Sequence, residues 1–320
     1  MDSITTNPEE MSRWRRRFHR QGLLYVLPAL VFFAVMVAYP LARAFYLSFF
    51  DYSVLKPDSA RFVGLDNYVK LFTRAPNRGP FLNTLQFTVI FVPPYVTISL
   101  LIALMLNRVR RGAVLLRTMI FVPVVVSMAV SAVMFTLFYN PVFGLGQKLL
   151  VAACDAVNGV CAWFGGAAVA AAPAAGMLGD PRWAMIAIAV LCLWNGIGVN
   201  VILYLVGLQH IPEQLLEAAE MDGATAWQRF WHVTLPQLRP TVYLVVLLAM
   251  IEAFKVFGQP YIMTAGGPQD STLTFVMRLY NTAFRYGTFE LGYASAMAYA
   301  LAVFILAFTL LIRKYNQPTE

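Results

Sequence analysis

The sequence predicts an all-α integral membrane protein with six transmembrane helices. Its 320 residues are 59% hydrophobic and only 12% charged, and the mean hydropathy is +0.65. In a typical soluble domain about a quarter of the residues are charged. Six apolar runs have the roughly 20 residues that a helix needs to cross a bilayer. These runs cover residues 23–50, 84–106, 114–138, 183–208, 242–263 and 291–312.

Prolines inside the first three runs are expected to kink the helices. They are Pro28, Pro40, the Pro93–Pro94 pair and Pro123. The first run follows basic residues, as in a secretory signal peptide, but it is longer than the 7–15-residue core of such a peptide. We therefore expect an uncleaved first helix.

Arginine and lysine set the predicted orientation, because cytoplasmic segments carry an excess of these residues close to the helix ends. With the N-terminus inside, the dense clusters fall on the cytoplasmic side. They are Arg13 to Arg20, Arg108 to Arg117, and Arg313 with Lys314. Residues 1–22 are thus a predicted cytoplasmic basic N-terminus and residues 313–320 a cytoplasmic tail.

Residues 141–182 are predicted to form a periplasmic insertion rather than a seventh span. Asp155, Asn158 and Pro173 leave no uninterrupted apolar run of spanning length around the alanine-rich core. A short surface helix is compatible with this stretch. An oxidising compartment would permit a disulfide between Cys154 and Cys161, although two free thiols are the favoured alternative.

The polar segment 209–240 is predicted to be a cytoplasmic loop with two short helices. Pro212 suits the first turn of one helix and Glu217 its positive end. Gly223 supplies a sharp break or a left-handed turn. The second helix covers residues 225–232, and Pro236 is expected to end it before the chain returns to the membrane.

Aromatic residues and an arginine lie on this second helix, among them Trp227 and Phe230. Such side chains are typical of a protein-docking surface. Periodicity alone leaves a helix pair lying on the membrane as an equal alternative.

Polar residues within spans are costly in hydrocarbon, so each is a candidate for a substrate pathway. The candidates in the fourth and fifth runs are Trp194, Asn195, Asn200, Tyr204, Glu252, Lys255 and Gln259. Glu252 and Lys255 are three residues apart and are expected to pair on one helix face. A purely structural ion pair is an equal alternative.

No catalytic residue, metal ligand or cofactor site is predicted. The sequence has no G-x-x-x-x-G-K-[ST], H-E-x-x-H or G-x-S-x-G motif. Its net charge of +8 is not gathered into a basic face with stacking aromatics, so no nucleic-acid partner is expected. Any ATP hydrolysis must come from another chain.

Several motifs resemble the permease subunits of binding-protein-dependent ABC importers. The most specific is E-A-A-x-x-D-G-A from Glu217, followed by T-L-P-x-L-x-P that ends at Pro240. The resemblance extends to Y-P-L-A-R-A-F-Y-L-S-F at Tyr39–Phe49, F-V-G-L-D-N-Y at Phe62–Tyr68, R-T-M-I-F-V-P at Arg117–Pro123 and F-K-V-F-G-Q-P-Y-I-M-T-A-G-G-P at Phe254–Pro268. Together these resemble the carbohydrate-uptake branch, which includes the maltose-type first permease and the sugar and glycerol-phosphate permeases.

The resemblance implies a type I importer permease in the bacterial inner membrane, with the loop docked in a cleft of the ATPase. By motif, the coupling residues are Glu217, Ala218, Ala219, Asp222 and Gly223, beside Trp227 and Phe230. The position of Trp194, Asn195 and Asn200 ahead of the loop resembles the place where the maltose-type permease contacts sugar.

The implied partners are an ABC ATPase dimer that binds ATP and Mg, a second homologous permease in a heterodimer, a periplasmic or lipid-anchored solute-binding protein, and membrane lipids. A di- or oligosaccharide is the expected substrate. Glycerol phosphate or another polar solute, and an ion-coupled secondary transporter, are the alternatives.

Overall fold

The structure, a computed structural model, describes residues 25–315 except 57, 59, 110, 164–171, 174, 286 and 288. The predicted basic N-terminus, part of the alanine-rich core and the tail beyond residue 315 lie outside the described residues. Within the described ranges, the only strands are β1 (Phe50–Asp51) and β2 (Arg61–Phe62), which pair antiparallel with Phe50 opposite Phe62. The predicted all-α class is confirmed.

Six helical units have the length and composition of membrane spans, if one bent helix pair counts as one unit. They are Tyr25–Leu47; α4 (Arg78–Arg108); the pair α5 (Ala113–Val125) and α6 (Met128–Phe138); α8 (Pro181–Gln209); the run Ala226–Met263; and Leu291–Lys314 within α14 (Leu291–Tyr315). The prolines at 93 and 94 lie inside a continuous α4.

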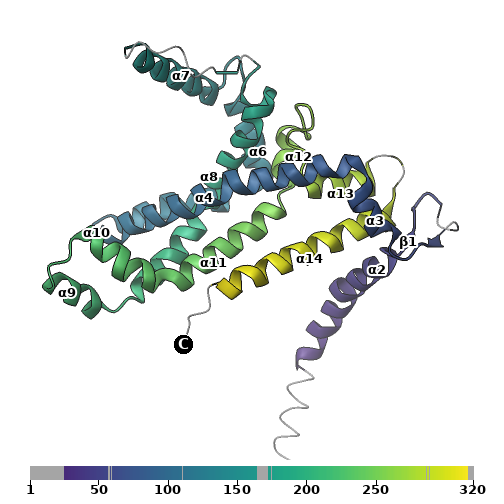
Figure 1. Ribbon diagram of the computed structural model, residues 1–320, viewed down its shortest axis with the longest axis horizontal. Helices are drawn as coiled ribbons and strands as arrows, with labels where there is room; N and C mark the ends of the chain where they lie inside the picture. The colour runs from purple at the N-terminus through teal and green to yellow at the C-terminus, as the bar shows by residue number, and fades with distance from the viewer. Residues whose placement is uncertain are drawn as a thin grey trace, which may run out of the picture.

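The first unit stands apart from the other spans (Figure 1). It contains a π-helical segment, η1 (Ala34–Ala38), and continues as α2 (Tyr39–Leu47), whose second residue is Pro40. None of its most apolar window is buried in this chain. It meets α14 where the Tyr299 hydroxyl donates a hydrogen bond to the Leu41 carbonyl oxygen at 2.7 Å.

α8 is the central helix of the bundle, and two of its glycines allow neighbouring helices to approach closely. A Cβ at Gly196 would collide with the hydroxyl of Tyr95 on α4. A Cβ at Gly198 would lie 2.6 Å from the backbone oxygen of Ile120 on α5. The positions of α4 and α5 against α8 therefore depend on glycine at both places, because any larger residue would hold the helices apart.

The third predicted span, residues 114–138, is not one helix but two, which meet at 95°. The break does not fall at Pro123, where a kink was expected, but at Val126 and Ser127, whose backbone is extended. Val126 still donates to the Pro123 carbonyl at 3.2 Å, which closes the last turn of α5.

A small cap covers the starts of α4 and α14. It consists of α3 (Asp66–Thr73), η3 (Ala75–Asn77) and α13 (Phe275–Phe284). Asn67 ties the cap to the segment that directly follows the first unit, because its Nδ2 donates to the carbonyl oxygens of Ser48 and Phe50, each at 2.9 Å.

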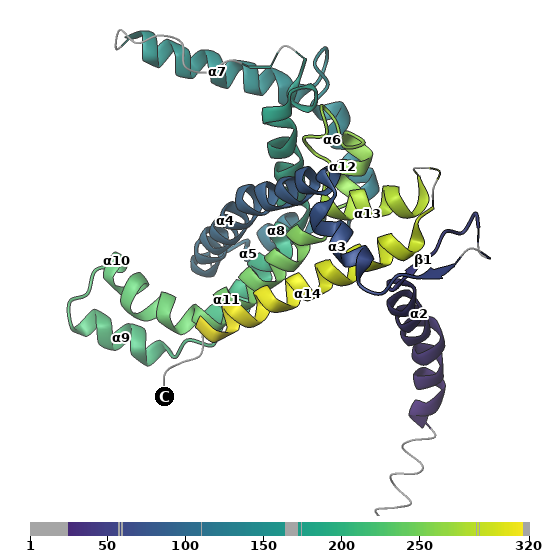
Figure 2. The ribbon, with the colours of Figure 1, turned by 45° about the vertical axis from the view of Figure 1, so that its right-hand side comes forward.

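The insertion contains a longer helix than expected, α7 (Leu145–Trp163), followed by a short 3-10 turn, η4 (Met177–Gly179). α7 projects away from the spans (Figure 2). Cys154 and Cys161 both lie on α7 as free thiols. Seven residues along a helix separate them by about 10 Å, so a bridge between them is geometrically excluded.

We predict that Gly198→Ala destabilises the protein by about 1–3 kcal/mol, because its Cβ would press on the backbone of α5. The melting temperature in detergent should fall by several degrees. Gly159→Ala on α7 is the matched control, since a Cβ there meets nothing within 4 Å. An unchanged melting temperature for Gly198→Ala would contradict the role of α8 as a close-packed centre.

Candidate functional site

The loop between the fourth and fifth spans forms an exposed knob of two helices, which Figure 2 shows at one end of the bundle. The first is α9 (Glu213–Met221) and the second is α10 (Ala226–Arg229). Gly223 joins them with a φ of 76°. Its N–H donates to Glu220 O and the Ala224 N–H donates to Ala219 O, each at 3.0 Å. This pattern is a Schellman cap, so the predicted left-handed turn at Gly223 is confirmed.

Two further interactions make the knob rigid. A capping box starts α10, in which Thr225 and Gln228 each bond the backbone of the other. An ion pair of 3.0 Å between Arg229 and Glu220 joins α10 to α9. Leu216 anchors α9 by packing against the core of the spans.

The predicted coupling residues lie together on this knob. Glu217, Ala218, Asp222 and Gly223 are exposed, whereas Ala219 is half-buried. Their exposed surface consists of small side chains with two carboxylates, and it is free to contact another protein.

An aromatic cluster extends this surface. Trp227 is 69% exposed, and its ring lies 6.2 Å from that of Phe230 and 5.5 Å from that of Trp231, centroid to centroid. Such a large exposed aromatic group is typical of an interface.

The second loop helix does not end at Pro236, contrary to expectation. After α10 the chain makes a π-helical turn, η5 (Phe230–Thr234), and continues as α11 (Leu235–Phe254) and α12 (Gly258–Met263). Pro236 falls in the first turn of α11, where its missing N–H costs little. The knob is therefore continuous with the fifth span.

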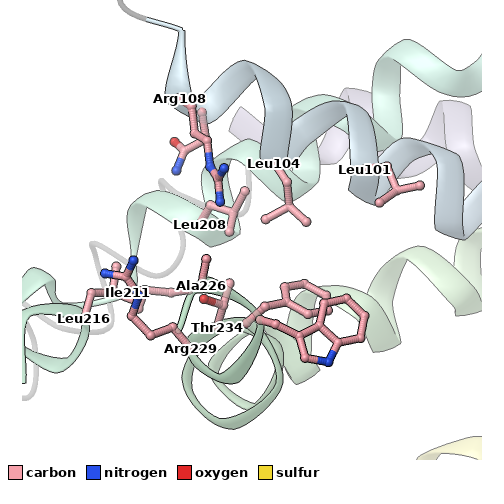
Figure 3. Close-up of a pocket in the computed structure, with 12 residues that line it drawn as sticks. Leu101, Leu104, Arg108, Leu208, Ile211, Leu216, Ala226, Arg229 and Thr234 are labelled. Atoms are coloured by element: carbon pink, nitrogen blue, oxygen red, sulfur yellow. The ribbon is translucent and has the colours of Figure 1, made fainter. Parts of the chain in front are cut away.

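A pocket of about 450 Å³ separates the knob from the ends of α4 and α8. Figure 3 shows Leu104 and Arg108 of α4 on one side, with Ala226 and Arg229 of the loop on the other. The knob thus contacts the spans at its edges, through Leu216 and through the continuous helix, rather than over its whole face.

The polar residues of the fifth span gather at a second pocket, of about 260 Å³. Glu252 of α11, Gln259 of α12 and Lys255 between these helices all line it. The structure brings these three predicted residues together.

Glu252 and Lys255 do not form the expected ion pair. Both are described residues, and no nitrogen–oxygen contact within 4.0 Å joins them. α11 ends at Phe254, so Lys255 caps the helix, with its N–H directed to the carbonyls of Ile251 and Glu252 at 3.2 Å. Both charged groups therefore remain at the pocket wall.

The predicted residues of α8 take other positions. Asn195 Nδ2 donates to the Pro123 and Val126 carbonyl oxygens at 2.8 and 3.4 Å, so it holds the break between α5 and α6. Trp194 packs on Phe135, with ring centroids 5.3 Å apart. Neither residue lines the second pocket.

Asn200 and Tyr204 lie one turn apart on α8 and are buried, with exposures of 3% and 0%. Asn200 Nδ2 and the Tyr204 hydroxyl have no hydrogen-bond partner among the described residues. Neither side chain lines the second pocket, and both are enclosed deep in the bundle.

An aromatic row on α4 was not among the pathway residues predicted from the sequence. Phe87 and Phe91 line the second pocket together with Cys192 of α8. Phe87 stacks on Phe91 at 5.3 Å and Phe91 on Tyr95 at 4.5 Å. The four-residue spacing of these rings was the signal in the sequence, because it places them on one helix face.

Among the described residues, no group of three or more His, Cys, Asp and Glu side chains is arranged to hold a metal ion. The chemistry of both pockets is that of hydrogen bonding, charge and aromatic contact.

Comparisons with known proteins agree with this geometry. The family model described as "Binding-protein-dependent transport system inner membrane component" matches residues 95–317. The chain is 35% identical to the probable ABC transporter permease protein YurN of Bacillus subtilis, over 91% of this chain and 94% of YurN. It is 31% identical to the lactose transport system permease protein LacF of Rhizobium radiobacter, over 94% and 95% of the two chains.

A solved bacterial ABC transporter that imports alginate has a chain with the same fold, with a TM-score of 0.73 at 22% identity, over 96% of this chain and 100% of that one. Permeases of this family are multi-pass subunits of the bacterial inner membrane that lack ATPase activity and need no cofactor of their own. The chain therefore belongs to the binding-protein-dependent ABC transporter permeases, in the carbohydrate-uptake family.

Proposed function

We propose that this chain moves a di- or oligosaccharide across the membrane and that the loop 217–240 couples the movement to a separate ATPase. One observation carries the proposal. The helical run Ala226–Met263 begins in the exposed knob and ends beside the polar pocket of Glu252 and Gln259. The 25 residues from Trp227 to Glu252 span about 37 Å of helix, so a displacement of the knob moves a wall of the pocket.

The coupling role falls to Glu217, Ala218, Ala219, Asp222 and Gly223, with Trp227 and Phe230 beside them. The small residues allow a partner helix to approach closely. The carboxylate of Glu217 makes no ion pair with a described residue, and it is available to a basic group of the ATPase. The ion pair between Glu220 and Arg229 joins the two helices of the knob.

The termini and the knob are assigned to the cytoplasm. In Figure 2 the C-terminal end of α14 lies at the knob end of the bundle, and Arg313 and Lys314 follow the apolar part of α14. An ATPase docked on the knob would then share its compartment with these basic residues.

The complex contains an ATPase dimer, a second homologous permease and a solute-binding protein. A solved structure of the alginate transporter, which holds an oligosaccharide-bound periplasmic protein and has the fold of this chain at 22% identity, supports the last of these partners.

Sugar is the proposed substrate because of the pocket chemistry and the relatives. Glu252, Lys255 and Gln259 offer hydrogen bonds to hydroxyl groups, and Phe87 and Phe91 offer aromatic surface. On α8, Trp194, Asn195, Asn200 and Tyr204 are proposed as further pathway residues, although none of them lines this pocket. The name of LacF specifies lactose. The MalF protein of Thermococcus litoralis is 30% identical to this chain, and its name specifies trehalose and maltose.

Glycerol phosphate is the second candidate. The UgpA protein of Agrobacterium fabrum, whose name specifies sn-glycerol 3-phosphate, is 31% identical over 89% of this chain. Lys255 lines the pocket and offers a cation to a phosphate group, whereas Glu252 on the same wall opposes an anion. The ion-coupled alternative has no such support.

We predict that Gly223→Asp abolishes uptake and uncouples ATP hydrolysis while the protein stays folded in the membrane. A Cβ at Gly223 meets nothing within 4 Å in this chain, and its left-handed φ of 76° is matched by the control below, so an effect beyond the control reports on the partner. Gly287→Asp is the control, because Gly287 has a φ of 75° and equally empty surroundings in another loop. Uptake and substrate-stimulated ATPase activity in proteoliposomes provide the measurement. Normal transport by Gly223→Asp would refute the docking assignment.

We predict that Gln259→Met slows sugar uptake about five-fold at low substrate, because one hydrogen bond is worth about 1 kcal/mol. Gln209→Met, which is exposed at the end of α8, should have no effect. Uptake is compared for lactose, trehalose, maltose and sn-glycerol 3-phosphate. Unchanged uptake of every transported solute by Gln259→Met would show that this pocket is not on the route.

A further inference from the structure

The knob is attached to the bundle by two stems, the end of α8 and the start of α11. α8 ends at Gln209, only a short turn ahead of α9, and the chain leaves α10 through η5 into α11. The pocket of about 450 Å³ lies between the base of the knob and α4, and Leu208 and Thr234 of the base line it. A movement of the knob therefore reaches the spans mainly through the two stems.

The stems approach each other closely at Gly207 of α8 and Thr241 of α11. A Cβ at Gly207 would lie 2.4 Å from Thr241 Oγ1 and 3.0 Å from both Cβ and Cγ2 of Thr241. Threonine is branched at Cβ, so no rotamer turns all of these atoms away. Glycine at position 207 is therefore required for the stems to pack together at this place.

α8 has three glycines, and each of them faces a different helix. Gly196 faces Tyr95 of α4, and Gly198 faces the backbone of α5. These two fix α8 within the bundle. Gly207 is the one of the three that faces a helix continuous with the knob, so its contact bears on how the knob is held.

Both stems lead from this contact to the pocket of Glu252. Cys192 of α8 and Glu252 of α11 line that pocket. Cys192 is 15 residues from Gly207, or about 22 Å of helix, and Glu252 is 11 residues from Thr241, or about 16 Å. Because the contact lies between the knob and the pocket on both helices, it decides whether the two walls move together when the knob is displaced.

We propose that Gly207 is a positioning residue for coupling, because its contact with Thr241 makes α8 and α11 move as one body when the ATPase displaces the knob. The inference rests on the coupling role proposed above for the loop. A side chain at position 207 would push the stems apart by about 1 Å, the difference between 2.4 Å and ordinary van der Waals contact. The knob would then move one stem without the other, and ATP hydrolysis would continue without moving both walls of the pocket.

Coupling is measured on the complete importer, purified with its ATPase, sister permease and solute-binding protein and reconstituted in proteoliposomes. The measured quantity is the solute taken up per ATP hydrolysed, for whichever of lactose, trehalose, maltose and sn-glycerol 3-phosphate the wild-type complex transports. Gly207→Ala should lower this ratio several-fold while ATP hydrolysis continues. Gly198→Ala, which presses α8 on α5 instead, should lower the melting temperature without changing the ratio. A wild-type ratio for Gly207→Ala would refute the proposal.

An exchange of the two residues separates a positioning role from a general loss of stability. The three nearest atoms that a Cβ at Gly207 would meet all belong to the Thr241 side chain. Gly207→Ala combined with Thr241→Gly therefore makes room for the added methyl group, and the ratio should return to near its wild-type value. A ratio that stays low in the double variant would overturn the proposal.

Distances between spin labels test the inference without a variant at Gly207. In a complex whose permease has its cysteines replaced by alanine, labels at Val206 and Leu244 report on the two stems, and labels at Gln214 and Leu311 report on the knob against α14. All four positions are exposed in this chain. When ATP and Mg are trapped with vanadate, the distance from knob to α14 should change and the distance between the stems should not. A change in both distances would refute the joint movement of the stems but not the docking of the loop. An unchanged distance from knob to α14 would contradict the docking itself, and the proposal with it.

Discussion

Inside a bilayer every backbone carbonyl must find its hydrogen-bond donor within the protein. At the break between α5 and α6, a side chain from another helix meets that requirement. Asn195 of α8 donates to the carbonyls of Pro123 and Val126, which lets the third unit bend by 95°. The bend directs α6 toward the projecting helix α7 (Figures 1 and 2). An amide that the sequence marks as a pathway candidate thus has a structural task in this conformation.

α8 is important both for the packing of the spans and for the proposed mechanism. Gly196 and Gly198 bring α4 and α5 against it, and only a short turn separates its last residue, Gln209, from α9 of the knob. The knob is continuous with the fifth span in the other direction. It is therefore held by two spans that both border the pocket of Glu252. A rigid body attached in this way transmits a rotation to the pocket rather than absorbing it, which is the mechanical requirement for coupling.

The surfaces that have no contact within this chain lie in separate regions of the molecule. The knob exposes small and aromatic residues at one end, and the first unit exposes apolar side chains around its whole circumference. A pocket of about 260 Å³ lies at the other end and is lined by Asn77 and Arg78 together with phenylalanine and leucine side chains. A protein partner is proposed for the polar loop, because its exposed aromatic and small side chains are typical of an interface.

The sequence by itself determined the class, the six apolar runs, the left-handed turn at Gly223 and the family, because hydropathy, glycine conformation and local motifs are properties of short segments. It did not determine the break at Val126 and Ser127, the helix that passes through Pro236, or the separation of Glu252 from Lys255. Each of these depends on a neighbour distant in the chain or on a change of helix type. Tertiary structure alone decided that Asn195 caps a broken helix while Gln259 lines a pocket, because both are amides in apolar runs and only their neighbours in space distinguish them.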